Sequence, residues 1–158
     1  MTAITPLEFI HKQGTFGDHQ KKNESDLLKI SEVKNLTIIQ IVQYKGSKIN
    51  INDIKIEGLE IPTQSSKVNL NKETRILWNA PRTWLILSSK ESIIDTIQKS
   101  FKDTDFAITD ISHSRAVIQI QGDQAKEILK KGSPINFNDF GVNECVGTAF
   151  HGITIIID

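Results

Sequence analysis

Four histidines and a single cysteine are the residues of this 158-residue chain that could bind a transition metal. They are His11, His19, His113, His151 and Cys145, and no two of them show the short spacing of a zinc-binding motif. A zinc site would therefore need several of these side chains to meet through folding alone. Ordinary surface or turn histidines are the simpler interpretation, and we predict no metal site.

A second group of polar residues has the composition of a hydrolytic triad. Asp110, Ser112, His113 and Ser114 supply an acid, hydroxyls and a base, but triads are assembled from separate segments and no G-x-S-x-G nucleophile elbow occurs. A turn between two strands explains this segment more simply. Cys145 would be a nucleophile only if a histidine met it, and a small buried hydrophobe is the favoured interpretation.

Nucleotide-binding loops are also missing from the sequence, which contains neither a G-x-G-x-x-G motif nor a phosphate loop. We therefore predict no catalytic residue and no cofactor-binding residue. A stand-alone enzyme that uses Cys145 or His113 is the least favoured hypothesis.

Trp78 and Trp84 bracket a turn that contains Pro81 and Arg82. The favoured interpretation is that both tryptophans anchor the core on paired strands, with the proline turn between them. The alternative is that Arg82, presented on the turn, makes an ionic or stacking contact with a ligand or a partner, because a guanidinium suits exposed planar contacts.

Composition argues against nucleic acid or an anionic membrane as a partner. Lysines and arginines number 19, aspartates and glutamates also number 19, and no basic surplus is left to neutralise phosphate. Apolar runs such as residues 153–157 are far shorter than the roughly 20 residues of a membrane helix. A single cysteine permits no internal disulfide, and the N-terminus lacks a signal-peptide pattern. We expect a soluble protein of the cytoplasm.

The chain divides into an N-terminal arm and one domain. Residues 1–35 are polar and irregular, whereas residues 36–158 carry the apolar patterns of a single α+β domain with one hydrophobic core. The arm also contains large apolar side chains, namely Leu7, Phe9, Ile10 and Phe16. Two interpretations have equal weight: an arm that lays these side chains on the body or on a partner, and a frayed terminus.

Short β-branched segments and two amphipathic helices predict the fold class. We expect strands over residues 36–42, 75–79, 83–87, 106–111, 115–121, 145–150 and 153–157. One helix follows an N-cap at Ser88 with Glu91 completing a capping box, and another begins at residues 122–123 and ends with Gly132 in a left-handed C-cap. Between residues 47 and 58 the isoleucine spacing favours a bulged strand or a hairpin.

The connections are too short for parallel crossovers. We therefore predict an α+β fold with a mostly antiparallel sheet, helices on one face and ferredoxin-like elements.

Several of these segments, in this order, resemble the gamma subunit of bacterial heterotetrameric sarcosine oxidase. The matching stretches are residues 76–85 (ILWNAPRTWL), residues 109–117 (TDISHSRAV), and a continuation through Gly122 to residues 129–135 (LKKGSPI). Weaker similarities lie at residues 14–17 and at Cys145 with Thr148. The resemblance covers most of the chain and is concentrated after residue 75.

The resemblance implies a fold related to the folate-binding domain of aminomethyltransferases and a non-catalytic, assembly-stabilising role. The partners would be the alpha, beta and delta subunits of an oxidase that demethylates sarcosine to glycine and passes the one-carbon unit to tetrahydrofolate. FAD, FMN, NAD and tetrahydrofolate are expected on those subunits and none in this chain. The alternative is a small folate- or pterin-binding module of one-carbon metabolism. The candidate contacts with a partner or ligand are Arg82, Trp84, Arg115 and Lys131.

Two departures from the family pattern bear on these expectations. The family implies a helix within residues 47–58, where the isoleucine spacing argues against one. Family members also continue past the final hairpin into another strand and a helix, whereas this sequence ends at Asp158. We therefore expect an open sheet edge or core face that a neighbour could cover.

Overall fold

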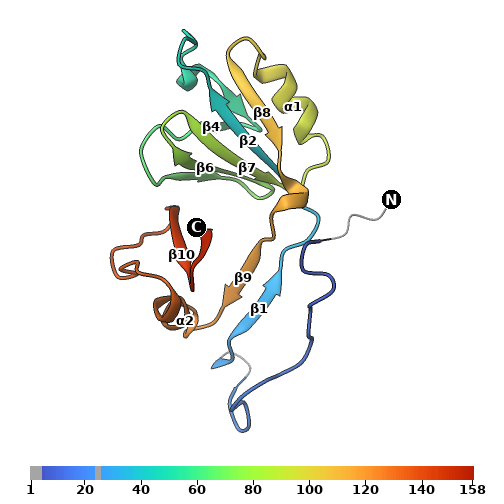
Figure 1. Ribbon diagram of the computed structural model, residues 1–158, viewed down its shortest axis with the longest axis vertical. Coiled ribbons are helices and arrows are strands. Elements are labelled where there is room, and N and C mark those ends of the chain that lie inside the picture. The colour runs from blue at the N-terminus through green and yellow to red at the C-terminus, as the bar shows by residue number, and fades with distance from the viewer. Residues whose placement is uncertain (1–4, 24–25) are drawn as a thin grey trace.

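An antiparallel sheet forms the body of the protein in the computed structural model, which describes residues 5–23 and 26–158 (Figure 1). Within these residues the sheet has five strands in the order β5-β6-β7-β2-β8. The strands are β2 (Thr37–Gln43), β5 (Val68–Leu70), β6 (Thr74–Ala80), β7 (Thr83–Ser88) and β8 (Phe106–Asp110). Every pairing in the sheet is antiparallel. The predicted fold class, α+β with a mostly antiparallel sheet, is confirmed.

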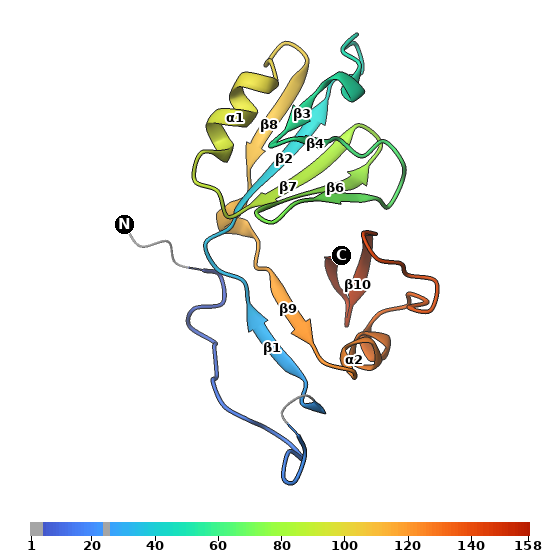
Figure 2. The same ribbon diagram turned by 180° about the vertical axis from the view of Figure 1, so that it is seen from behind.

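Helix α1 (Ile93–Ser100) covers one face of this sheet and closes the main core (Figure 2). Ile39 and Ile41 are two residues apart in β2 and so project to the same face, where they belong to one core with Ile93 and Ile97, which are fully buried. At the end of the helix, the ring of Phe101 meets Phe106 edge to face, with 4.8 Å between the ring centroids. The apolar spacing in the sequence thus predicts the buried positions Ile93, Ile97 and Phe101, whereas Ile94 is 37% exposed.

The isoleucine spacing predicts the segment between residues 47 and 58 only in part, because a hairpin begins at residue 55 while residues 47–54 form a loop with one short helical turn. Strands β3 (Lys55–Ile56) and β4 (Leu59–Glu60) are paired antiparallel, and helical structure is limited to the short 3₁₀ turn η2 (Ile51–Asp53). Glu57 and Gly58 form the turn with φ angles of 50° and 80°, the positive values of a type I′ hairpin. Ile56 is fully buried and fixes the hairpin to the main core.

The remaining elements extend away from the five-stranded sheet, as Figure 1 shows. After the 3₁₀ turn η3 (Ser112–Ser114), strand β9 (Ile118–Gln121) pairs with β1 (Lys29–Glu32) in a two-stranded ribbon. Helix α2 (Ala125–Gly132) follows, and β10 (Val146–Phe150) and β11 (Ile153–Ile157) form the expected closing hairpin. In contrast to α1, helix α2 contains no buried residue.

The closing hairpin is attached to the body through the edge of β5. The amide of Val68 donates to the carbonyl of Asn143 at 2.9 Å, and the amide of Cys145 donates to the carbonyl of Ser66 at 2.7 Å. Between these bonds, Lys67 forms an ion pair with Glu144 at 2.8 Å. Cys145 packs there in a small second core, on the face of the sheet opposite α1.

Both predicted helix caps are wrong, and packing explains why. Helix α1 begins at Ile93, whereas Ser88 ends β7 and its buried hydroxyl bonds to that of Thr74 at 2.8 Å. Gly132 is the last residue of α2 and is not left-handed. A Cβ at Gly132 would lie 2.6 Å from the ring of Phe150, so glycine is needed there for close packing.

Strand β1 lies inside the segment that the sequence assigns to a polar arm. Its sequence, Lys-Ile-Ser-Glu, has no strong strand pattern, and its partner β9 is distant along the chain. Across the described residues, neither helix is long and apolar enough to cross a lipid bilayer.

Candidate functional site

Arg82, the first of the predicted contact residues, lies exposed in the turn between β6 and β7. Its φ of 60° places it in the left-handed region at the second central position of the turn, where glycine or asparagine is usual. The guanidinium Nη1 donates a hydrogen bond to the carbonyl of Tyr44 at 3.0 Å, which offsets part of this strain. Arg82 is thus presented to solvent on a short, defined turn.

Trp84 is a core residue. Its exposed fraction is 4%, it packs in the main core under α1, and its indole Nε1 donates to the carbonyl of Pro62 at 2.7 Å. Trp78 is half-buried against the same core. The favoured interpretation of the tryptophans as core anchors is confirmed, and Trp84 has no exposed ring face to offer a partner.

The other two predicted contact residues lie far from Arg82. Arg115 follows η3, beside the start of β2, where the amide of Ile38 donates to the hydroxyl of Ser112. Arg82 lies beside the opposite end of β2, where its carbonyl accepts from the amide of Gln43. A strand as long as β2 spans about 20 Å. Lys131 is exposed near the end of α2, so these three basic residues do not form one cluster.

The triad-like segment is a turn, as predicted. The Ser112 hydroxyl donates to the carboxylate of Asp110 at 2.5 Å, and the Ser112 amide donates to the same oxygen at 2.9 Å. These hydrogen bonds from Ser112 hold the pKa of Asp110 below its usual value. The carboxylate therefore caps the turn after β8 and is poorly suited to accept a proton from a nucleophile.

Cys145 is a small buried hydrophobe, again as predicted. Its exposed fraction is 2%, and its thiol lies 3.2 Å from the carbonyl oxygen of Trp78. Burial raises the pKa of this thiol to about 11, so the thiolate that a nucleophile requires is scarce at neutral pH. Among residues 5–23 and 26–158, no three side chains of His, Cys, Asp or Glu come together as a metal site would require.

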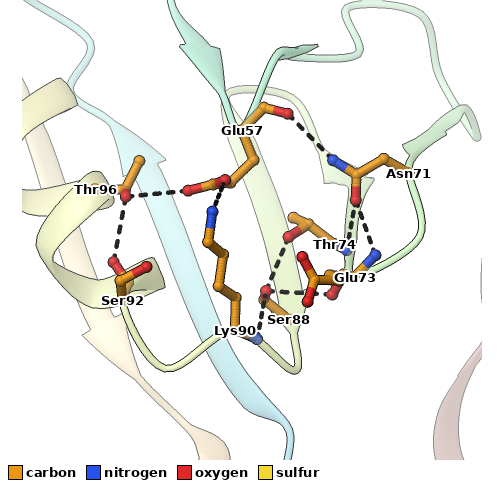
Figure 3. Close-up of polar contacts among 8 residues, drawn as sticks. All are labelled: Glu57, Asn71, Glu73, Thr74, Ser88, Lys90, Ser92 and Thr96. Atoms are coloured by element: carbon orange, nitrogen blue, oxygen red, sulfur yellow. Dashed lines mark hydrogen bonds and ion pairs between the residues drawn. The ribbon is translucent and has the colours of Figure 1, made fainter.

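A polar cluster around Glu57 connects three parts of the body (Figure 3). The Glu57 carboxylate pairs with Lys90 and accepts from the hydroxyl of Thr96 at 3.2 Å, while its carbonyl accepts from Asn71 at 3.1 Å. The Lys90 amide in turn donates to Ser88 at 3.1 Å. The cluster ties the β3–β4 turn to α1 and to the ends of β6 and β7. Sequence spacing gave no signal for it, because its members come from four separate segments.

Replacing Glu57 with glutamine is expected to make stability less dependent on pH. Lys90 lowers the pKa of Glu57 in the folded chain, so the pair stabilises the fold above the ordinary carboxyl pKa, and this contribution is lost as pH falls through the lower folded value. Glu57 likewise raises the pKa of Lys90, whose contribution is lost only as pH rises through that raised value. Melting temperatures of wild type and Glu57→Gln should differ at pH 7 and converge in acid.

The control for this measurement is Glu60→Gln in the same hairpin. Glu60 pairs with Lys55 at 3.2 Å across the two strands, and its side chain is 69% exposed. Such surface pairs contribute little, so its melting curve should follow that of wild type at every pH. A constant offset of Glu57→Gln from wild type down to the acid limit would contradict the expected linkage.

Large apolar side chains are exposed in the N-terminal arm, in the β1–β9 ribbon and on the closing hairpin. Phe9 and Ile10 in the N-terminal arm are 89% and 70% exposed, and Ile30 and Ile118 in the ribbon are 59% and 54% exposed. On the closing hairpin, Ile153 is 70% exposed. The arm and the ribbon run side by side in Figures 1 and 2, and exposed apolar groups on neighbouring segments are typical of surfaces that bind another protein.

Comparisons with known proteins relate the chain to a curated protein and to solved structures. No family model matches the chain. Over 87 residues the chain is 28% identical to sarcosine oxidase subunit gamma of Corynebacterium sp. (strain U-96). This confirms the resemblance to the gamma subunit of sarcosine oxidase. The match covers 53% of this chain and 42% of that gamma subunit, so the chain spans less than half of the relative's length.

One such solved structure is a heterotetrameric sarcosine oxidase from Corynebacterium sp. U-96 in complex with pyrrole 2-carboxylate. One of its chains superimposes with a TM-score of 0.75 at 23% identity, over 85% of this chain and 71% of that one. The likeness shows that the fold is shared.

Proposed function

We propose that this chain is a non-catalytic gamma subunit that stabilises a heterotetrameric sarcosine oxidase. The observation that supports the proposal most directly is the similarity to a gamma subunit, which agrees with the resemblance of residues 76–85 and 109–135. The fold shared with a chain of a heterotetrameric oxidase supports it independently.

The side chains of the body suit a structural role. Side chains of types that often take part in catalysis instead stabilise the fold here. Asp110 caps a turn, Cys145 lies in the core as a thiol, and Glu57 ties a hairpin to α1. The apolar surface around the ribbon and the arm is left for protein contacts. In this proposal the chain contributes binding surface to the oxidase rather than reacting groups.

The complex would work in the cytoplasm and demethylate sarcosine oxidatively to glycine, with tetrahydrofolate as one-carbon acceptor. Its alpha, beta and delta subunits would be the partners of this chain and would hold FAD, FMN, NAD and tetrahydrofolate. No observation favours the folate- or pterin-binding alternative, and we do not propose it.

Co-expression of the tagged chain with the other three subunits of the oxidase tests the proposal. We expect the tag to retain one copy of each subunit through size-exclusion chromatography, and the complex to oxidise sarcosine. The isolated chain is expected to give no turnover. An oxidase that assembles fully and keeps its thermal stability without this chain would overturn the proposal.

Arg82 remains a proposed contact with a partner subunit, as do Arg115 and Lys131. Arg82→Gly is the sharpest variant, because glycine suits the left-handed position and the free energy of unfolding should change by less than about 1 kcal/mol. Loss of an interfacial arginine should nevertheless weaken binding by about 2 kcal/mol, a Kd increase of about 30-fold. Lys21→Gly is the control, since Lys21 is also basic and has a φ of 63°. Equal affinities for the two variants would remove Arg82 from the interface.

A further inference from the structure

Residues 5–11 form a compact N-terminal turn. The amide of Glu8 donates to the carbonyl of Thr5 at 3.2 Å, and the amide of Ile10 donates to the carbonyl of Leu7 at 3.0 Å, so two tight turns follow one another. Leu7 is half-buried, whereas Phe9 and Ile10 point to solvent. A segment with so small a share of buried apolar surface needs other contacts to hold its shape.

Those contacts come from the end of β1 and the residues after it. One carboxylate oxygen of Glu32 accepts from the Thr5 hydroxyl at 3.1 Å and lies 2.8 Å from Nε2 of His11. The Glu32 side chain is only 3% exposed, so the N-terminal turn covers it. Lys34 forms an ion pair with Glu8 at 2.9 Å. The turn is thus fixed at both of its ends and in its middle while it presents Phe9 and Ile10 outward.

The ribbon beneath this turn has one apolar and one polar face. Ile30 is paired with Ile120, and Glu32 is paired with Ile118, so these four side chains project to the same side. The opposite side carries Lys29, Ser31, Gln119 and Gln121. Because Thr5 and His11 bind the Glu32 side chain, the N-terminal turn lies at the end of the apolar face and brings the exposed Phe9 and Ile10 to that end of the ribbon.

We propose that the N-terminal turn and the apolar face of the ribbon form one docking surface for an apolar groove on another subunit of the oxidase. The inference rests on the proposed function and names the surface through which this chain would assemble. Figures 1 and 2 both show the arm running alongside the ribbon, away from the body and its core.

The charges at this surface indicate an apolar partner. Glu32 is already satisfied by Thr5 and His11, and Glu8 is already paired with Lys34. A partner that approached with its own charges would have to break these contacts or bury charges without partners, which is costly. A groove lined with apolar and aromatic side chains would neither break these contacts nor bury a charge without a partner.

The size of the surface favours a groove on a different protein over a second copy of this chain. Phe9 alone can bury about 150–250 Å², and stable interfaces bury about 800 Å² on each partner. Two ribbons with strands of four residues, stacked face to face, would bury only a few isoleucine side chains on each copy and would fall short of that area. A groove that encloses the turn and the ribbon together buries all of these side chains.

Two double variants test the docking surface, Phe9→Ser with Ile10→Ser in the turn and Ile30→Thr with Ile118→Thr in the ribbon. Threonine keeps the strand preference of isoleucine, and all four side chains are exposed, so the fold and melting temperature should be retained. Binding of each tagged variant to the co-purified remaining subunits is measured by surface-immobilised kinetics. We expect the Kd to rise at least about tenfold for either pair.

The controls are Phe16→Ser in the same arm and Ile153→Thr on the closing hairpin, at positions that are 71% and 70% exposed but lie outside the surface. Their Kd values should stay within about twofold of wild type. If wild type binds the other subunits and both double variants bind with the same Kd, the proposed docking surface is wrong and the proposed function is unaffected. Wild type that binds no oxidase subunit would instead refute the proposed function.

Hydrogen exchange on the wild-type chain gives a readout that needs no variant. Amides of residues 5–11, 29–32 and 118–121 should exchange more slowly once the oxidase is assembled. Unchanged exchange in all three segments would contradict the proposal. A homodimer that dissociates in the Phe9→Ser, Ile10→Ser variant would also overturn it, because the occupant would then be a second copy.

Discussion

Trp84→Ala is expected to lower the free energy of unfolding by about 3–5 kcal/mol, the cost typical of removing a large aromatic side chain from a close-packed core. The indole is 4% exposed and belongs to the main core between the sheet and α1. Its removal also leaves the carbonyl of Pro62 without the hydrogen bond it now accepts. Urea unfolding followed by far-ultraviolet circular dichroism measures the change, with the slope against urea expected to stay constant.

Trp84→Phe separates the two contributions. Phenylalanine retains much of the apolar volume but donates no hydrogen bond, so the loss should be smaller, about 1–3 kcal/mol for the unsatisfied carbonyl and the imperfect fit. If Trp84→Ala unfolded within about 1 kcal/mol of wild type, the packing described for the core would be wrong.

Trp84 also shows what the sequence can and cannot decide about the contact residues. A tryptophan on either side of a proline turn predicts paired strands with core anchors, and both strands are present. Whether an aromatic ring faces the core or a partner depends on which side of the sheet α1 covers, and that arises from long-range packing. Arg82 could be placed on a turn from its neighbours, but its left-handed φ could not.

Local periodicity predicted the body of the fold well. Residues 36–42 and 153–157 were expected as strands, and the observed β2 and β11 span Thr37–Gln43 and Ile153–Ile157. Both strands are runs rich in isoleucine and other β-branched residues, a composition that is visible without the partner strand. The same reasoning favours β structure between residues 47 and 58, and of the four isoleucines there only Ile56 lies in the β3–β4 hairpin, whereas Ile51 lies in a 3₁₀ turn.

Interactions between distant segments account for the errors. Ser88 and Glu91 have the spacing of a capping box, yet the Ser88 hydroxyl is used in a buried pair with Thr74 and the helix begins later. Strand β1 was missed because its four residues acquire a strand partner only through β9. The sequence left the apolar residues of the arm with two interpretations, and the exposure of Phe9 and Ile10 shows that the body does not cover them.

The second large effect is expected at Gly122, which connects β9 to α2. Its φ of +117° lies in the region that favours glycine, and a Cβ there would approach the backbone oxygen of Leu27 to 2.8 Å. Alanine therefore adds strain of about 1–3 kcal/mol from the dihedral angle and about 1–3 kcal/mol from overpacking. No rotamer can relieve a contact between Cβ and the backbone, so the chain must move.

We expect Gly122→Ala to open the ribbon rather than unfold the protein. Leu27 precedes β1, and Gly122 follows the residue that pairs with Lys29, so the clash separates the two strands at their open end. An isolated two-stranded ribbon is marginally stable, and the added cost exceeds what its pairing can supply. Ile41 and Ile86 in the main core are fully buried elsewhere and should be unaffected.

Hydrogen exchange resolves this local effect from global unfolding. In Gly122→Ala, amides of residues 29–32 and 118–121 should lose most of their protection, while those of β2 and β7 keep theirs. Gly147→Ala is the matched control, because a Cβ at that glycine meets nothing within 4 Å and its φ is not positive. Protection of the ribbon equal to that of wild type would show that the Gly122 turn tolerates a side chain.

Opening the ribbon should also weaken binding to the other subunits. This effect of losing an ordered ribbon can be separated from the effect of losing side chains that contact the partner. If the apolar face of the ribbon docks on another subunit, Gly122→Ala must raise the Kd although residue 122 is not part of that face, because binding then has to order the strands. Adding Ile30→Thr and Ile118→Thr to Gly122→Ala should change the Kd less than the same pair does in wild type, since both act on one surface. A Kd that neither Gly122→Ala nor the isoleucine pair changes would instead place the ribbon outside the interface and leave Gly122 with a role in folding alone.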